Sequence, residues 1–301
     1  MDTPLRGESP ASPGRRPRVL VVDDEAALRS LLRRALEREG FEVAEAADAA
    51  EAVRGFRTFA PAVAVLDIML PDRDGISLLA ELRELDPGAA IIIATGRGDE
   101  ESSLRGGASS FFRKPFLLPE LVQEVRQLAA WRSRAGTTAA APAAGAQRLS
   151  LGTGDAHDPS FIGALTLPLE RLLGEAELLG VRIGIGEMVT NAVEHGNLGI
   201  SAGEKEDALA GGRFADVLAS RLAMPSNAGK RVWIESRLAD GEFRVTVRDE
   251  GAGFDWRALA VAEPGATLAG RGVLLARVHF DEVRWNERGN EVTLVKRIPG
   301  L

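Results

Sequence analysis

Short apolar runs alternate with amphipathic stretches over residues 18–131, and this alternation restricts the fold more than any other feature. The first run, residues 19–22, is apolar at every position, which is typical of a strand buried on both faces. Repeated strand and helix units favour a five-stranded, parallel, doubly wound sheet. Strands are predicted at 19–22, 41–45, 62–66, 91–95 and 110–113, and helices at 26–39, 48–58, 76–84 and 117–131, with a shorter helical piece before the last strand.

Polar residues gather where these predicted strands end. Asp23 and Asp24 follow the first strand, Asp67 follows the third, Thr95 ends the fourth and Lys114 follows the fifth. The carboxyl ends of parallel strands share one edge, so these residues are expected to meet there. Three clustered carboxylates repel one another unless a cation lies among them, which predicts a Mg²⁺ site. Asp67 can then attack a phosphoryl group, while Lys114 pairs with the new charge and Thr95 hydrogen-bonds a phosphate oxygen.

Three motifs in this half, V-V-D-D-E at 21–25, D-I-M-L-P-D-R-D-G at 67–75 and K-P-F at 114–116, resemble the receiver domain of two-component response regulators. The resemblance covers residues 18–131 and implies a flavodoxin-like fold, bound Mg²⁺ and a sensor histidine kinase as partner. The roles it implies are Asp67 as phosphoacceptor, Asp23 and Asp24 as Mg²⁺ ligands with Asp67, Thr95 as switch hydroxyl, Lys114 as phosphate contact, Phe112 as rotating aromatic residue, and a cis peptide before Pro115.

One spacing departs from the family pattern. Only 19 positions separate Thr95 from Lys114, which is about one helical turn fewer than usual for the family. A truncated fourth helix is therefore expected. Receivers commonly dimerise or contact an effector through this face, so the usual symmetric dimer is not expected to transfer, and a homodimer stays an open alternative.

The second half centres on residues 186–197. In an α-helix, Glu187, Asn191 and His195 would follow one another at i, i+4 and i+8 and share one ridge, with Met188 and Val189 among the apolar residues opposite. An amide oxygen is a suitable Mg²⁺ ligand, and a nearby carboxylate can orient or deprotonate a nucleophile. The same polar stripe also fits an ordinary amphipathic helix, so this segment alone does not decide the function.

Two glycine-containing segments follow later in the chain. A predicted strand over 243–248 runs into D-E-G-A-G-F-D at 249–255, and G-R-G at 270–272 opens an apolar helix. Asp249 at a strand end can accept a hydrogen bond from an adenine amino group, and glycine lets a backbone approach a nucleotide closely. Each glycine cluster alone is also typical of surface turns.

Taken in order, E-x-x-x-N-A-x-x-H, D-x-G-x-G-F-D and G-R-G resemble the GHKL ATPase superfamily, which includes gyrase and histidine kinases. The resemblance covers residues 160–299, is closest to the anti-sigma-factor serine kinase branch, and implies ATP and Mg²⁺ as cofactors. The roles it implies are Glu187 as general base, Asn191 as Mg²⁺ ligand, Asp249 as adenine-binding residue, His195 beside the cofactor, Gly251, Gly253, Gly270 and Gly272 as pocket-shaping residues, and Arg271 near the phosphates.

The predicted organisation has four parts. Residues 1–17 form a disordered tail, 18–131 the receiver, 132–147 an Ala/Gly/Pro linker and 148–301 the ATP-binding domain. The last part is predicted to be an α+β two-layer sandwich with a mostly antiparallel sheet. Its helices are expected at 165–179, 186–197 and 204–222, and its strands at 230–238, 242–248, 281–287 and 291–298.

Composition limits the classes of function. The chain has no cysteine and only three histidines, which excludes disulfides and thiolate metal sites and favours a hard, oxygen-bound metal. A net charge of −7 argues against an overall basic field, so no nucleic acid partner is expected. No segment approaches the roughly 20 apolar residues of a membrane span, so no membrane contact and a cytoplasmic location are expected.

Together these patterns predict a response regulator that is phosphorylated on Asp67 and has an anti-sigma-type serine/threonine kinase as its output domain. Its second partner would be a protein substrate or a sigma or anti-sigma antagonist. One alternative is a histidine-kinase-like catalyst, although His157 and His279 do not lie on a predicted dimerising hairpin. Another is a non-enzymatic switch in which ATP holds a partner-binding conformation. A transcription factor would need a basic recognition helix, which the pattern after the receiver does not show.

Overall fold

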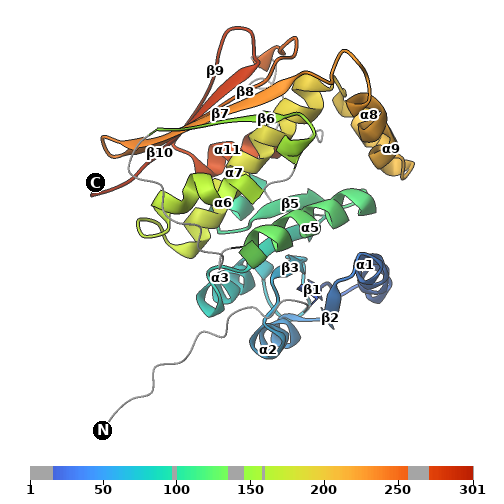
Figure 1. Ribbon diagram of the computed structural model, residues 1–301. Helices are drawn as coiled ribbons and strands as arrows, with labels where there is room; N and C mark the ends of the chain where they lie inside the picture. The colour runs from blue at the N-terminus through green and yellow to red at the C-terminus, as the bar shows by residue number, and fades with distance from the viewer. Residues whose placement is uncertain (1–15, 97–99, 135–145, 158–159, 257–270, 301) are drawn as a thin grey trace.

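The computed structural model describes residues 16–96, 100–134, 146–157, 160–256 and 271–300 (Figure 1). These residues build two five-stranded sheets, one parallel and one antiparallel. Helices of the second half lie between the antiparallel sheet and the receiver (Figure 1). Predicted residues 1–15 of the tail and 135–145 of the linker lie outside the described residues.

The first sheet has the strand order β2-β1-β3-β4-β5, and all its pairs are parallel, which confirms the predicted doubly wound fold. Its inner strands β1, β3 and β4 are almost entirely buried, in agreement with their unbroken apolar runs. The five strands are β1 Arg18–Val22, β2 Glu42–Ala46, β3 Val63–Leu66, β4 Ala90–Thr95 and β5 Ser110–Arg113.

Helices cover both faces of this sheet, with α1 against α5 on one face and α2 against α3 on the other (Figure 1). Asp48 and Asp74 start two of them, because their side chains accept hydrogen bonds from the backbone N–H groups of the first turns. The expected truncation agrees with the six residues of α4 that the structure describes, which follow residues 97–99 outside the described part of the chain. The helices are α1 Ala26–Arg38, α2 Ala49–Phe59, α3 Gly75–Leu85, α4 Glu100–Arg105 and α5 Leu118–Arg134.

The second sheet has the order β6-β7-β8-β10-β9 with only antiparallel pairs, which confirms the predicted α+β sandwich. Exposed and buried residues alternate along β7, so only one face of the sheet packs on helices. β6 was not predicted; it forms an edge of the sheet by pairing with β7. The strands are β6 Gln147–Gly152, β7 Arg231–Ala239, β8 Glu242–Arg248, β9 Glu282–Trp285 and β10 Glu291–Arg297.

Two predicted helices of the second half are wrong in extent. The segment 165–179 is not one helix, because the chain passes through a 3₁₀ turn containing Pro168, which lacks the N–H that a continuing helix needs. The segment 204–222 is split at Gly211 and Gly212, where Gly212 has a φ of +64°. The observed elements are η1 Asp155–His157, α6 Ser160–Thr166, η2 Leu167–Leu169, α7 Glu175–Asn191, η3 Ala192–Asn197, α8 Ala202–Ala210, α9 Phe214–Leu222 and α11 Arg271–His279.

Helix α7 is buried nearly all round, because the antiparallel sheet covers one side and the receiver approaches the other (Figure 1). Gly180 and Gly184 let α11 come close to it, since a Cβ atom at either position would overlap His279 or Phe280. On the receiver side, α5 contacts α6, α7 and α8, and α4 contacts α11. The helical layer of the second domain is therefore also the domain interface.

Candidate functional sites

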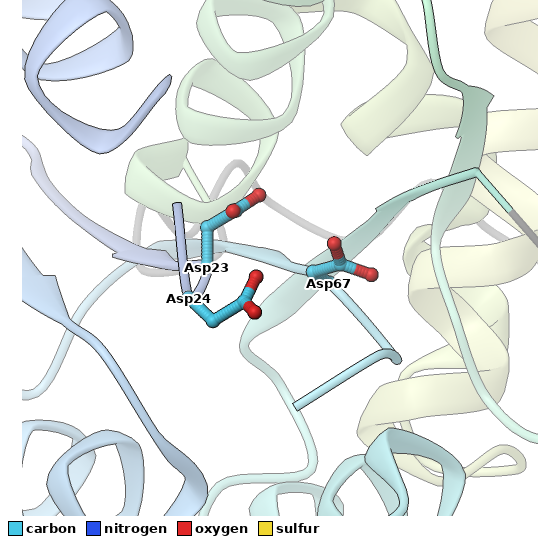
Figure 2. A group of neighbouring side chains, drawn as sticks. All are labelled: Asp23, Asp24 and Asp67. Carbon is cyan, nitrogen blue, oxygen red and sulfur yellow. The ribbon is translucent and has the colours of Figure 1, made fainter. Parts of the chain in front are cut away.

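The carboxylates Asp23, Asp24 and Asp67 lie together at the carboxyl ends of β1 and β3 (Figure 2). One oxygen from each lies within 4.8 Å of the others. Asp23 and Asp67 are buried, whereas Asp24 is exposed. Parallel strands with their carboxyl ends at one edge bring these residues together, as the sequence predicted.

Backbone groups and one lysine orient these carboxylates. The N–H of Glu25 donates to Oδ1 of Asp23, and the N–H of Met69 donates to Oδ1 of Asp67, both at 2.9 Å. The other oxygen of each carboxylate accepts a hydrogen bond from Lys114 Nζ at 2.6 Å. Burial lowers the pKa of Lys114, but these two hydrogen bonds outweigh that effect and leave the pKa above its ordinary value.

The donor set fits Mg²⁺. All three acidic groups offer hard oxygen ligands, and their summed charge exceeds what one lysine neutralises. Thr95, which is fully buried at the end of β4, accepts a hydrogen bond through its carbonyl oxygen from the N–H of Lys114 at 2.9 Å. The Lys114–Pro115 peptide is cis, as the resemblance implied.

A cavity of about 320 Å³ lies in the second domain between the C-terminal end of α7, η3 and the sheet strands β8 and β10. Four of the predicted cofactor-binding residues line it, namely Asn191, His195, Asp249 and Gly253. Apolar side chains supply much of the remaining wall, including Met188 and Val273. A mostly apolar cavity with a few convergent polar groups is typical of a small-molecule site.

Asp249 and Glu291 are the acidic residues that line this cavity, and Asp249 is 8% exposed. Burial raises its pKa to about 6, and the hydrogen bond that the N–H of Gly251 donates to its Oδ1 at 2.8 Å opposes this rise. Gly196 lies so close that a Cβ atom there would overlap the Asp249 carboxylate. The glycine after His195 is therefore required for Asp249 to reach the cavity wall.

The helix around Asn191 changes geometry where the prediction continued an α-helix. From Ala192 the chain forms the π-helical segment η3, which ends at Asn197. Asn191 and His195 line the cavity, whereas Glu187, one turn before Asn191 in α7, does not. His195 Nδ1 lies 2.5 Å from the carbonyl oxygen of Ile200, which orients the ring in the wider turn.

Asn197 was not predicted as a site residue, although it is fully buried and ties η3 to the sheet. Its Oδ1 accepts a hydrogen bond from the N–H of Glu250 at 2.8 Å. Its Nδ2 donates to Thr153 Oγ1 and to the carbonyl oxygen of Arg231, both at 3.0 Å. Asn197 thus holds the segment that carries Asp249 against η3. The only sequence signal was its place at the end of the polar run 186–197.

Glu187 faces the start of α11, where a Cβ atom at Gly272 would overlap its carboxylate. Burial raises the pKa of Glu187 to about 7, and the negative charge of Glu124 adds to the rise, while Arg271 opposes it. A carboxylate that titrates near neutral pH is suited to accept a proton.

The remaining predicted glycines serve close backbone contacts. A Cβ atom at Gly251 would overlap the carbonyl group of Gly196, and one at Gly253, whose φ is +82°, would overlap the carbonyl oxygen of Arg288. Gly270 lies outside the described residues.

Arg271, which was predicted to lie near the phosphates, contacts the receiver. Its Nη2 lies 3.0 Å from Oε2 of Glu124, and its Nη1 lies 3.7 Å from Oε1 of Glu120. Its guanidinium carbon lies 4.2 Å from the centre of the Phe112 ring. Glu120, Glu124 and Phe112 all belong to the first domain, so this contact joins the two halves.

Two family models match the chain. The response regulator receiver domain matches residues 19–126, and the histidine kinase-like ATPase domain matches residues 215–296. Glu187, Asn191 and His195 lie before the second match, whereas Asp249 and Gly253 lie within it. The cavity brings residues from both stretches onto one wall.

Known relatives match the receiver half. Chemotaxis protein CheY of Halobacterium salinarum is 40% identical over 111 residues, which are 36% of this chain and 92% of that protein. Transcriptional regulatory protein TrcR of Mycobacterium tuberculosis is 45% identical over 114 residues, which are 37% of this chain and 44% of that protein. The chain thus spans about half the length of the mycobacterial regulators that it matches. A solved CheY-like receiver domain protein from Methanospirillum hungatei is 32% identical, with a TM-score of 0.39, over 40% of this chain and all of that one.

Among the residues that the structure describes, no helix has both the length and the apolar character required to cross a membrane.

Proposed function

Because the chain belongs to the response regulator receiver family and carries a histidine kinase-like ATPase domain, we propose that it is a cytoplasmic response regulator with a serine/threonine protein kinase of the anti-sigma type as its output. The observation that carries the proposal is the shared cavity wall of Asn191, His195 and Asp249, with Glu187 beside the start of α11. Its partners would be a sensor histidine kinase and a protein that receives phosphate or belongs to a sigma-factor circuit.

In the receiver, an oxygen of Asp67 attacks the phosphorus of a phosphohistidine on the sensor kinase, the phosphorus–nitrogen bond breaks, and an acyl phosphate forms. Asp23, Asp24 and Asp67 would hold Mg²⁺, which supplies positive charge to the cluster when bound. Lys114, already 2.6 Å from Asp67, pairs with the phosphoryl oxygens. The Thr95 hydroxyl donates a hydrogen bond to one of them.

In the second domain, Asp249 accepts a hydrogen bond from the adenine amino group, and the oxygen of Asn191 would hold Mg²⁺. Glu187 accepts the proton of a serine or threonine hydroxyl on the protein substrate. The hydroxyl oxygen attacks the γ-phosphorus of ATP, and ADP leaves. Gly272 keeps Glu187 close to the start of α11, where the phosphates are proposed to lie.

A second candidate is an ATP-gated switch that binds a partner without transferring phosphate. The specific observation in its favour is that Arg271 faces the receiver and Glu187 does not line the cavity. In that case ATP would act by stabilising one arrangement of the two domains.

A calorimetric titration of Mg-ATP into the full-length protein, with and without beryllofluoride, tests the ATP site. A second assay supplies γ-labelled ATP and a serine/threonine peptide library to the wild type and to Glu187→Gln. We expect ATP binding by both proteins and peptide labelling by the wild type alone. Binding without labelling would support the switch, acid-labile phosphohistidine would support a histidine-kinase-like catalyst, and the absence of ATP binding would overturn the ATP-dependent proposals.

A further inference from the structure

Arg271 makes a contact that spans 147 positions of the chain. It begins α11 in the second domain, yet its charged partners Glu120 and Glu124 lie on α5 of the receiver. The side chain of Arg271 is only 16% exposed in this position. The guanidinium is therefore held inside the domain interface and is not presented to solvent.

The carboxylates of Glu120 and Glu124 are buried and are stabilised by a nearby cation. Glu120 and Glu124 are 8% and 4% exposed, so their charges are largely removed from water. Removing a cationic partner from a buried carboxylate is costly, and a planar guanidinium can serve two carboxylates while stacking on an aromatic ring. Phe112 supplies that ring. Glu120, Glu124 and Phe112 thus all contact or face the one guanidinium.

The same arginine adjoins the proposed phosphate side of the ATP site. The next residue, Gly272, lies against the carboxylate of Glu187, and Val273 lines the cavity, so Arg271 lies two residues from the cavity wall. Phosphate oxygens are strong acceptors for a guanidinium and would compete with carboxylates for it. One arginine cannot serve both sets of oxygens in full.

The receiver end of this contact is linked to the phosphorylation site through the chain after β5 and one ion pair. Phe112 lies on β5, two residues before Lys114, and the Lys114 ammonium donates a hydrogen bond to the Asp67 carboxylate. A phosphoryl group on Asp67 would draw Lys114 towards new oxygens and thereby act on the strand that carries Phe112.

We propose that Glu120 and Glu124 are positioning residues of the ATP site, contributed by the receiver, which hold Arg271 on Phe112 in competition with the phosphates of ATP. This inference rests on the proposed ATP-binding function. Phosphorylation of Asp67 loosens the contact of Arg271 with the receiver and so strengthens ATP binding. Because coupling between two sites is reciprocal, ATP binding favours phosphorylation of Asp67 by the same factor.

The test compares the affinities for Mg-ATP and for adenosine, which lacks phosphates, in the full-length protein. Glu124→Gln weakens the hold on Arg271, so it is expected to raise the ATP affinity about tenfold and leave the adenosine affinity unchanged. Glu124→Asp keeps the charge and is expected to behave like the wild type. Glu84→Gln, an exposed change on α3, is the matched control.

Arg271→Met completes the test. It is expected to lower the ATP affinity, to spare adenosine, and to abolish the effect of Glu124→Gln in the double variant. If Glu124→Gln does not fold, beryllofluoride on the wild type is the replacement, and it should raise the ATP affinity but not the adenosine affinity. If neither Glu124→Gln nor beryllofluoride raises the ATP affinity while adenosine still binds, the competition for Arg271 is overturned and the proposed ATP-binding function stands. Failure of the wild type to bind either compound would overturn the proposed function as well.

Discussion

The ammonium nitrogen of Lys114 lies 2.6 Å from a carboxylate oxygen of Asp67, although 47 positions separate the two residues. The same nitrogen lies 2.6 Å from Asp23, so one cation bridges two buried carboxylates. Lys114 therefore compensates the negative charge of both buried carboxylates, and its removal would leave them buried without this cation.

Lys114→Met is expected to destabilise the metal-free protein by about 3 kcal/mol, because it leaves Asp23 and Asp67 buried without their cation. Added Mg²⁺ should restore much of the loss, since it binds the same oxygens. Chemical denaturation in EDTA and in Mg²⁺ measures both effects. Equal stability of the variant and the wild type in EDTA would show that the bridge does not compensate the carboxylates.

Asp67→Asn is expected to abolish phosphorylation by acetyl phosphate, because it removes the nucleophilic oxygen. A gel that retards phosphoproteins, run with and without hydroxylamine, detects the acyl phosphate. Asp72→Asn is the matched control from the same motif. The Asp72 carboxylate accepts hydrogen bonds from the N–H groups of Ala49 and Ala50 at the start of α2, so that variant should still be phosphorylated. A labelled Asp67→Asn protein would mean that another residue accepts the group.

Asp249→Asn is expected to weaken the binding of ATP and adenosine alike, about tenfold to a hundredfold, because a charge-assisted hydrogen bond to the base becomes a weaker one. The preference for ATP over GTP should fall as well. Calorimetry with the three compounds provides the readout. Glu250→Gln, at the exposed neighbouring residue, should leave all three affinities near those of the wild type. A selective loss of ATP but not adenosine would place Asp249 away from the base.

Glu187→Gln is expected to stabilise the protein at pH 8 by on the order of 1–3 kcal/mol, because it removes a poorly solvated charge. Burial, followed by the charge of Glu124, raises the pKa of Glu187 in the folded protein to about 7 from an ordinary value of 4.5. The folded state thus binds the proton more tightly, and the cost of ionisation is present above pH 7 and absent below pH 4.5. Denaturation at pH 8 and at pH 4.5 should therefore show the difference only at the higher pH.

Gly196→Ala is expected to reduce the affinity for adenosine more than tenfold, because the added Cβ atom would displace the Asp249 carboxylate from the cavity wall. Gly203→Ala is the matched control, since nothing lies near its Cβ position in α8. That control should bind adenosine normally and gain up to about 1 kcal/mol of stability from its better helix propensity. Equal adenosine binding by the two variants would contradict the role of Gly196.

Local patterns were sufficient for the receiver. Its strands were predicted from apolar runs, and the meeting of Asp23, Asp67 and Lys114 followed from the rule that parallel strands end at one edge. The architecture of the second sheet was also predicted, because its strands alternate and are joined by short turns. These features depend on neighbouring residues or on topology alone, and both are visible in a sequence.

Tertiary packing decided the rest. The π-helical segment after Asn191 arises where η3 is tied to the sheet by Asn197. The place of Arg271 depends on Glu124, a residue of the other domain, and the pKa of Glu187 is raised first by burial in the packed structure and then by the charge of Glu124. The sequence by itself thus determined the two folds and the candidate chemical groups. Only the tertiary structure decided which of those groups face one another, because charges and contacts act through space between residues far apart in the chain.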